Sequence, residues 1–303
     1  MADLDPRRLE TFRVVATVGQ VSAAARALHR SQPAVTAQIR QLEEECGAAL
    51  FVRTARGMVL NARGRALLVH AQRARQVLDE AAAAVAEESR PGGELVLAAS
   101  TTIASYVLPP ILVGFCTAQP GVGVRLEVGN TAQVLDWVKE GRVPLGLVEG
   151  HARAQGLRLE RFLSDELLPV VAGEAKAPLA QVRRLADLMR VPLVWREPGS
   201  GTRAVVERAL KRAGSARGAR EGDLQLGSTE AIRAAVALGG GVGFLSRFVI
   251  RRELSTGALR PLAIPGLRVE RAFSWVLPGG ELSGLPRRFR RFAQEAASAA
   301  GAV

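Results

Sequence analysis

The amino-acid sequence predicts a small helical domain followed by a larger α/β domain, and three observations support this division. Apolar residues in the first 50 positions recur with helical spacing, and no segment there shows convincing strand alternation. Residues 62–89 then form one long helical pattern, which Pro91, Gly92 and Gly93 end. After residue 93, short apolar strands alternate with amphipathic helices, which is the pattern of βαβ units and largely parallel sheets.

Composition limits the classes of protein that fit this chain. The 303 residues are 48% hydrophobic, so they can bury a sizeable core and do not resemble a mainly disordered protein. No apolar run reaches 18 residues, and Asp3, Asp5 and Glu10 lie where a signal peptide needs an apolar core. We therefore expect a cytoplasmic protein without a membrane span. Cys46 and Cys116 are too few for a disulfide framework or a four-cysteine zinc site.

Positive charge is concentrated toward the N-terminal end. The formal net charge of the chain is +12, and its first 75 residues contain 12 arginines and six acidic residues. A small basic module favours binding to a polyanion such as a nucleic acid. On charge alone, a solvated basic face is an equally good interpretation.

Three helices are expected in the first 50 residues. The first runs from Pro6 to Val18 and ends at Gly19. Ser22 is a suitable N-cap for a short alanine-rich helix, and Ser31 for a third helix with Pro33 in its first turn. The second and third helices, joined by ALHRSQPA, have the dimensions of a helix-turn-helix.

The third helix would present polar side chains opposite its apolar stripe, and such side chains can read base edges in the major groove. Arg53 and Arg56 flank a turn at Gly57 between two short extended runs, which suits a wing that lies along phosphates. The candidate DNA-binding residues are Ser22, Ser31, Gln32, Pro33, Thr36, Gln38, Arg40, Arg53 and Arg56.

The long helical pattern over residues 62–89 contains the seam of a short coiled coil. Its apolar positions recur alternately four and three residues apart, at Leu67, Ala71, Ala74, Leu78, Ala81 and Val85. The seam favours dimerisation through this helix. An amphipathic helix packed on its own domain is the alternative.

No complete enzyme motif occurs in the sequence. The segment GGGVG at 239–243 lacks the third glycine of a dinucleotide-binding loop, and PGSGT around Ser200 is not a nucleophile elbow. His29, His70 and His151 are scattered and have no paired metal-ligand motif, so we expect neither a metal nor another cofactor. A metabolic enzyme with a nucleic-acid-binding appendage would need a catalytic set, so we expect a protein that is not an enzyme.

The stretch from Leu9 to Leu68 closely resembles the winged helix-turn-helix of LysR-type transcriptional regulators. The motifs A-A-x-x-L, S-Q-P-A-V-T/S-x-Q-I-x-x-L-E and L-F-x-R are in register along it. The resemblance implies a DNA-binding head, a dimerising helix and an effector domain of two α/β subdomains like those of periplasmic binding proteins. It also implies a homodimer that assembles to a homotetramer on double-stranded promoter or operator DNA, with RNA polymerase as a further candidate partner.

Domain boundaries are expected near the changes of pattern. They give a DNA-binding domain over 1–61, a linker helix over 62–90 and an effector domain over 91–303. The effector domain would divide into subdomain I, about 91–164 and 268–303, and subdomain II, about 165–267.

Three positions depart from the family pattern. Ala37 stands in the recognition helix where relatives often have a longer polar or basic side chain, so direct base reading there is weaker or falls to its neighbours. Asn61 replaces the common Thr after the wing, but Asn can also cap the linker helix. Pro144 stands where many relatives have Asp, so a ligand contact normally made there is in question.

Hydroxyl-bearing helix starts follow several of the predicted strands. Each offers free N–H groups, a hydroxyl and the positive end of a helix dipole. Because such helix starts meet at the crevice of a parallel sheet, they predict a site for a small anion or carboxylate. Each set taken singly is better explained as an ordinary N-cap, but four sets beside strand ends favour a ligand site. The candidate effector-binding residues are Ser100, Thr101, Thr102, Thr131, Glu149, Arg196, Ser200, Thr202 and Ser228.

Arg196 and Arg203 flank the helix start at Ser200 and could neutralise a bound charge. Arg196 could equally pair with Glu197 or Glu149. The sequence as a whole predicts a DNA-binding transcriptional regulator that is controlled by a small anionic metabolite. An architectural DNA-binding protein without an effector is the remaining alternative.

Overall fold

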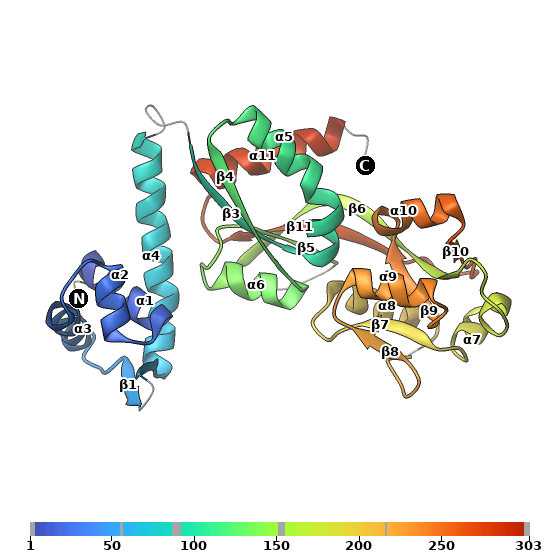
Figure 1. Cartoon of the computed structure of the whole chain (residues 1–303), viewed down its shortest axis with the longest axis horizontal. Coiled ribbons are helices and arrows are strands. Elements are labelled where there is room, and N and C mark those ends of the chain that lie inside the picture. Colours follow the sequence, from blue (N-terminus) through green and yellow to red (C-terminus); the bar gives the residue numbers. More distant parts are fainter. Residues whose placement is uncertain (1–3, 55–56, 87–91, 151–154, 216, 300–303) are drawn as a thin grey trace. The chain divides into compact units, whose positions relative to one another are not determined.

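The computed structural model describes residues 4–54, 57–86, 92–150, 155–215 and 217–299. Contacts divide the chain into two units, Met1–Arg90 with Lys139–Arg142 and Pro91–Val138 with Val143–Val303. Figure 1 shows the helical head and long helix of the first unit and the mixed α/β structure of the second. Within the described ranges, no helix is both long enough and apolar enough to cross a membrane.

The first unit is a helical head with a two-stranded wing and one long helix. Its elements are α1 (Pro6–Val18), α2 (Val21–Ala27), α3 (Gln32–Glu45), β1 (Phe51–Thr54), β2 (Gly57–Leu60) and α4 (Ala62–Ala86). The stripe predicted for α3, Val35, Ile39 and Leu42, is buried against Phe12 and Val15 of α1. Burial of this stripe fixes which face of α3 remains in solvent.

Local capping signals predict the ends of α1 and α3 but not the start of α2. Gly19 ends α1 with a φ of 70°, and the hydroxyl of Ser31 caps α3. The prediction that Ser22 is an N-cap is wrong, because α2 begins one residue earlier, at Val21. Gln20 occupies the N-cap position there and makes no side-chain capping bond.

The helix α4 is covered by the head over its first turns and exposed farther along. Ala71 is 3% exposed and packs with Leu67 in the core of the head, which is the alternative considered for this helix. Val77 and Leu78 are 61% and 49% exposed. The first part of the predicted seam therefore packs into the core of the head, and the part of α4 beyond it exposes an apolar surface. The side chain of Val85 lies outside the described residues.

The second unit is built on one mixed sheet with helices on its faces. The strands are β3 (Gly93–Ser100), β4 (Val122–Gly129), β5 (Gly146–Glu149), β6 (Leu157–Ala172), β7 (Leu193–Arg196), β8 (Leu224–Leu226), β9 (Val242–Ser246), β10 (Leu259–Pro261) and β11 (Glu270–Pro278). The helices are η1 (Ile103–Val107), α5 (Leu108–Ala118), α6 (Thr131–Lys139), η2 (Leu179–Gln181), α7 (Leu185–Leu188), α8 (Gly201–Arg212), α9 (Thr229–Ala237), α10 (Arg247–Thr256) and α11 (Gly284–Ala299).

The sheet is less parallel than the alternating sequence pattern predicts. Its order is β4-β3-β5-β11-β6-β9-β7-β8, with β10 paired to β6. Three strands run parallel at each end, but β6 and β11 pair antiparallel with each other and with their outer neighbours. Five of the 16 residues of β6 are charged, which obscures the alternation of a strand, so the sequence pattern does not predict β6.

Two subdomains share the long strands β6 and β11 (Figure 1). In the first subdomain, apolar cores lie beneath α5 and α11 on one face of the sheet and beneath α6 on the other. In the second, they lie beneath α7 and α8 on one face and beneath α9 and α10 on the other. Asp165 of β6 pairs with Arg271 of β11 close to the point where β6 turns from β11 to β9. Charged side chains therefore occupy the crossing between the two subdomains.

Asn61 joins the wing to α4, as its sequence position predicts for a helix cap. Its Oδ1 accepts from the N–H of Gly64 at 2.9 Å, which caps the helix. Its Nδ2 donates to the carbonyl oxygen of Ala49 at 2.7 Å, which holds the segment before the wing.

Replacing Asn61 with Ala is expected to lower the free energy of unfolding of the N-terminal unit by about 0.5–2 kcal/mol, because the cap acceptor is lost. Asn61→Asp is the matched control, since it keeps an acceptor for Gly64 and loses only the donor to Ala49. Urea denaturation followed by circular dichroism compares the two. An equal loss in both variants would show that the bond to Ala49, rather than the cap, carries the effect.

Candidate functional site

The N-terminal part of α3 is presented to solvent. Gln32, Pro33 and Thr36 are exposed there, whereas Val35 and Ile39 on the other side of the helix are buried. Burial of the apolar side prevents the helix from turning its polar residues inward. The amide of Gln32 and the hydroxyl of Thr36 can therefore reach base edges of a DNA duplex.

Three other candidates in the head are placed differently. The Oε1 of Gln38 accepts from the hydroxyl of Thr11 at 2.6 Å, and Thr11 is 1% exposed, so Gln38 helps to hold α3 against α1. Arg40 is exposed and pairs with Glu44 at 3.1 Å, an arrangement that a phosphate can replace at little cost. Ser22 is half-buried in the first turn of α2.

The wing is anchored to α3 by a residue that the sequence analysis did not consider. The Oε1 of Glu43 accepts from the N–H of Leu50 at 2.7 Å, directly before β1. Arg53 lies in β1 opposite Met58 and is exposed. Arg56 lies outside the described residues. Glu43 therefore fixes the wing and the exposed face of α3 in one rigid arrangement.

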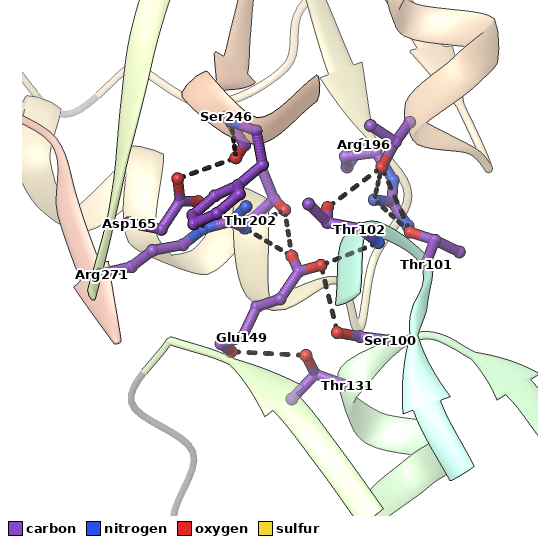
Figure 2. A network of polar contacts seen from close by, with 12 residues as sticks. Ser100, Thr101, Thr102, Thr131, Glu149, Asp165, Arg196, Thr202, Ser246 and Arg271 are labelled. Carbon is purple, nitrogen blue, oxygen red and sulfur yellow. Dashed lines mark hydrogen bonds and ion pairs between the residues drawn. The ribbon is translucent and has the colours of Figure 1, made fainter. Parts of the chain in front are cut away.

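In the second unit, Glu149 accepts hydrogen bonds from several of the donors that the sequence assigns to a bound ligand. It ends β5 and is 2% exposed. Its Oε1 accepts from the hydroxyl of Ser100 at 3.1 Å and the N–H of Thr102 at 3.2 Å (Figure 2). Its Oε2 accepts from the hydroxyl of Thr202 at 2.5 Å. Ser100, Thr102 and Thr202 do converge, but the anion at their centre is a side chain of this protein.

Arg271 balances the charge of Glu149 and extends the cluster to the crossing strands. Its Nη1 donates to Glu149 and to the hydroxyl of Thr202, and its Nε donates to Asp165 at 2.7 Å (Figure 2). Ser246 also donates to Asp165, at 2.8 Å. Neither Arg271 nor Asp165 lies at a helix start, so the pattern of hydroxyl-bearing helix starts does not point to them. The signal available for Arg271 was a charged residue in the largely apolar strand β11, whereas Asp165 shares β6 with four other charged residues.

Burial and ion pairing have opposite effects on the pKa of Glu149. Desolvation alone raises its pKa, but Arg271, Thr202 and Thr102 together hold the pKa at about 2. Because this value lies below the ordinary 4.5, Glu149 is charged at neutral pH, and its stabilising effect is lost only as the pH falls from about 4.5 toward 2. Desolvation raises the pKa of Asp165 in spite of its pairing with Arg271.

Arg196 links the two subdomains on the other side of this cluster. It is 4% exposed and forms an ion pair with Glu197, with contacts of 2.8 and 3.0 Å. Its Nη1 donates to the hydroxyls of Thr101 and Thr229, each at 3.0 Å. Of the two pairings that the sequence left open, the direct one is with Glu197. The hydroxyls of Thr101 and Thr229 also form a hydrogen bond of 3.2 Å, which joins the start of η1 to the start of α9.

The helix starts of α9 and α6 contribute to this cluster in other ways than the sequence predicts. Ser228 accepts from the N–H of Ala231 at 3.0 Å and is a standard N-cap of α9. The neighbouring Thr229, at the same helix start, contacts Arg196 in its place. Thr131 lies at the start of α6 and donates to the carbonyl oxygen of Glu149 at 3.4 Å.

Ser200 differs from these residues because it opens onto a pocket. It occupies the N-cap position of α8 without making a capping bond, and it is 4% exposed. Its Oγ is buried and has no hydrogen-bond partner in the described part of the chain. A pocket of about 420 Å³ lies between α6 and α8, and its lining includes Thr131, Leu135, Glu149, Ser200, Arg203 and Arg208.

The start of α8 is packed directly against β5. A Cβ atom on Gly201 would lie 2.2 Å from the carbonyl oxygen of Glu149, so this close approach requires glycine. The first N–H groups of α8 have no partner within the helix, and they lie at the positive end of its dipole. Arg203 adds positive charge nearby, although it also pairs with Glu207 at 2.8 Å. The pocket therefore combines a buried hydroxyl with donors suited to an anionic group.

Two family models match the chain along most of its length. Residues 6–65 match the bacterial regulatory helix-turn-helix protein model of the lysR family, and residues 88–298 match the LysR substrate binding domain. The uncharacterized HTH-type transcriptional regulator YeiE of Escherichia coli K12 is 35% identical over 93% of this chain and 94% of its own. The RuBisCO operon transcriptional regulator of Allochromatium vinosum is 34% identical over 94% of each chain.

Solved structures agree with this assignment. ArgP from Mycobacterium tuberculosis has the same fold, with a TM-score of 0.77, 20% identity and 98% of both chains covered. The regulatory domain of CcmR from Synechocystis PCC6803, in complex with 2-PG, is 27% identical, with a TM-score of 0.59 over 67% of this chain and 97% of that chain. With a family model over each unit and relatives above 30% identity over nearly its full length, the chain belongs to the LysR family of transcriptional regulators, which combine a DNA-binding helix-turn-helix with an effector-binding domain and are not enzymes.

Proposed function

We propose that this regulator binds a specific operator through α3 and the wing, and that a small anionic metabolite in the pocket beside α8 modulates this binding. The observation that carries the choice of an anion is the buried Oγ of Ser200. This atom lacks a partner among the described residues, and Ser200 is one of the residues that line a pocket of about 420 Å³ at the start of α8. Such a site holds carboxylate or phosphate oxygens through N–H groups and needs little side-chain charge.

The size and lining of the pocket support a metabolite rather than a macromolecule. Its volume lies within the range of small-molecule pockets, about 300–1,000 Å³. Leu135 supplies an apolar wall, and the lining holds two arginines, Arg203 and Arg208, beside the carboxylates of Glu149 and Glu207. The related CcmR domain is in complex with 2-PG, and by analogy we infer a small ligand for this domain as well.

A ligand in this pocket would contact both subdomains. Thr131 and Leu135 belong to α6 of the first subdomain, and Ser200 and Arg203 lie at the start of α8 in the second. A ligand that binds one arrangement of the subdomains better shifts the population toward it. A coupling of about 1–3 kcal/mol is enough to change operator occupancy several-fold.

On the DNA side, the exposed start of α3 would enter the major groove and the wing would lie along the backbone. The exposed apolar stretch of α4 at Val77 and Leu78 would pair with the same helix of a second copy. We infer a cytoplasmic dimer that assembles further to a homotetramer on promoter DNA, with RNA polymerase as a candidate partner.

Base reading and phosphate contact predict different effects for Gln32 and Arg53. Gln32→Ala is expected to weaken binding to the specific operator by about 1–3 kcal/mol and binding to random DNA much less. Arg53→Ala is expected to weaken binding to both and to lower the salt slope by about one unit. Fluorescence anisotropy titrations at several salt concentrations measure both. If Gln32→Ala weakens both duplexes equally, Gln32 does not read sequence.

Leu78 tests the role of α4 in assembly. Leu78→Asp is expected to convert the protein to monomers, because a carboxylate cannot be buried unpaired in a coiled-coil core. Leu78→Ala is the control, since it shortens the side chain without adding charge and should leave a weaker dimer. Sedimentation velocity measures both variants. An intact Leu78→Asp dimer would place the interface elsewhere.

Ser200 tests the effector site. Ser200→Ala should weaken binding of the anionic ligand about tenfold or more, because a hydrogen bond to a charged group is lost. Ser228→Ala is the matched control, since it removes a hydroxyl that only caps α9. Calorimetry with a panel of small carboxylates and phosphate esters, including 2-PG, measures the affinities. Binding only of neutral apolar ligands, or the same affinity loss in both variants, would contradict the proposal.

A further inference from the structure

Glu149 is surrounded as a bound ligand would be. Its two carboxylate oxygens accept from a hydroxyl of β3, a backbone N–H at the start of η1, a hydroxyl of α8 and the guanidinium of β11. These donors come from four elements in three separate parts of the sequence, around residues 100–102, 202 and 271. In Figure 2 the carboxylate lies at the centre of the contacts, with its stem entering from the end of β5.

The donors also come from both subdomains. Ser100 and Thr102 lie in the first subdomain, Thr202 begins α8 of the second, and Arg271 lies at the crossing. A carboxylate of the first subdomain therefore reaches the helix start of the second. This is the position from which an anionic ligand would bridge the two.

Little room remains around the groups that hold this carboxylate. The void lined by Thr102, Thr202 and Arg271 has a volume of about 10 Å³, close to the least that holds one water molecule. The Nη2 of Arg271 is buried and has no hydrogen-bond partner among the residues that the structure describes. Donor capacity is thus left over, but Glu149 fills the space that a second anionic group would need.

We propose that Glu149 is a specificity-determining residue, whose carboxylate acts as a tethered anion and restricts the effector to a single anionic group. That group binds at Ser200, so the inference rests on the proposed function and adds the charge class of the ligand. A dianion that competed for Thr202 and Arg271 would displace Glu149 and leave it buried without its partners. Separating a buried charge from its partner is strongly unfavourable. The ionised state of Glu149 at neutral pH, with its pKa held at about 2, is consistent with this role.

The test empties the tethered-anion site and offers it a free anion. Glu149→Ala removes the carboxylate and leaves the donors of Ser100, Thr102, Thr202 and Arg271 in place. We expect a lower Tm than that of the wild type. We expect sodium formate to raise the Tm of this variant in a saturable way, relative to sodium chloride at equal ionic strength. At about five times its Kd, formate should raise the Tm by about 2–4 °C.

Two variants serve as controls for this rescue. Glu149→Gln fills the same volume, so formate has no space to enter and should act as it does on the wild type. Glu94→Gln removes an exposed carboxylate that pairs with Arg125, outside the cluster, and should also respond like the wild type. A formate shift of equal size in Glu149→Ala and the wild type would overturn the proposal.

Refolding provides a second measurement if Glu149→Ala does not accumulate as folded protein. The denatured variant is diluted into formate or into chloride of equal ionic strength. A higher yield of folded protein in formate supports the tethered-anion site, and equal yields contradict it.

The specificity itself is tested with ligands that differ in charge. We expect the thermal shift by succinate, relative to that by propionate, to be larger for Glu149→Ala than for the wild type. An unchanged ratio would refute the role in specificity.

Because formate rescue does not depend on Ser200, its failure refutes the role of Glu149 alone. Intact rescue with no loss of anion binding in Ser200→Ala would instead refute the proposed effector site.

Discussion

A charged side chain that is almost fully removed from water requires partners on every side, and Glu149 imposes this requirement on the second unit. At 2% exposure its carboxylate is stabilised by hydroxyls, an N–H group and Arg271. Since the net stability of a buried ion pair depends on good geometry and full hydrogen bonding, the strand end, the helix starts and the crossing strand are held close to one arrangement. The glycine at position 201 satisfies the same constraint, because α8 can reach β5 only without a Cβ atom there.

In the helical head, side-chain oxygens also accept hydrogen bonds that hold neighbouring elements, but these side chains are more exposed than Glu149. Glu43 accepts from the backbone before the wing, and Gln38 accepts from the buried hydroxyl of Thr11. Both residues belong to α3, the helix that also presents Gln32 and Thr36 to solvent. One helix therefore supplies the surface proposed for DNA and the side chains that keep this surface rigid. Such support from neighbouring side chains is what positions a recognition surface accurately.

Sequence reasoning succeeded where the signals are local. Gly19 and Ser31 define helix ends through their own backbone and side chains, and the α3 stripe follows from helical spacing. It failed where the outcome depends on distant partners. The antiparallel pairing of β6 with β11, and the contact of Asp165 with Arg271, join residues about 100 positions apart, and no short segment carries a signal for them. The sequence groups Ser100, Thr102, Thr202 and Glu149, because strand topology brings helix starts together. Only the structure shows that the carboxylate of Glu149 accepts hydrogen bonds from the other three.

The sharing of β6 and β11 between the subdomains has a consequence for synthesis on the ribosome. The chain leaves the first subdomain along β6, forms the second, and returns along β11 and α11. Trp275 and Phe289, which are fully buried in the core of the first subdomain, are therefore made after the helices and the other strands of the second. Domains usually fold in the order in which they emerge. Here most of the second subdomain emerges while the first still waits for its last strand and helix, so an early-translated sheet stays open until β11 and α11 have emerged.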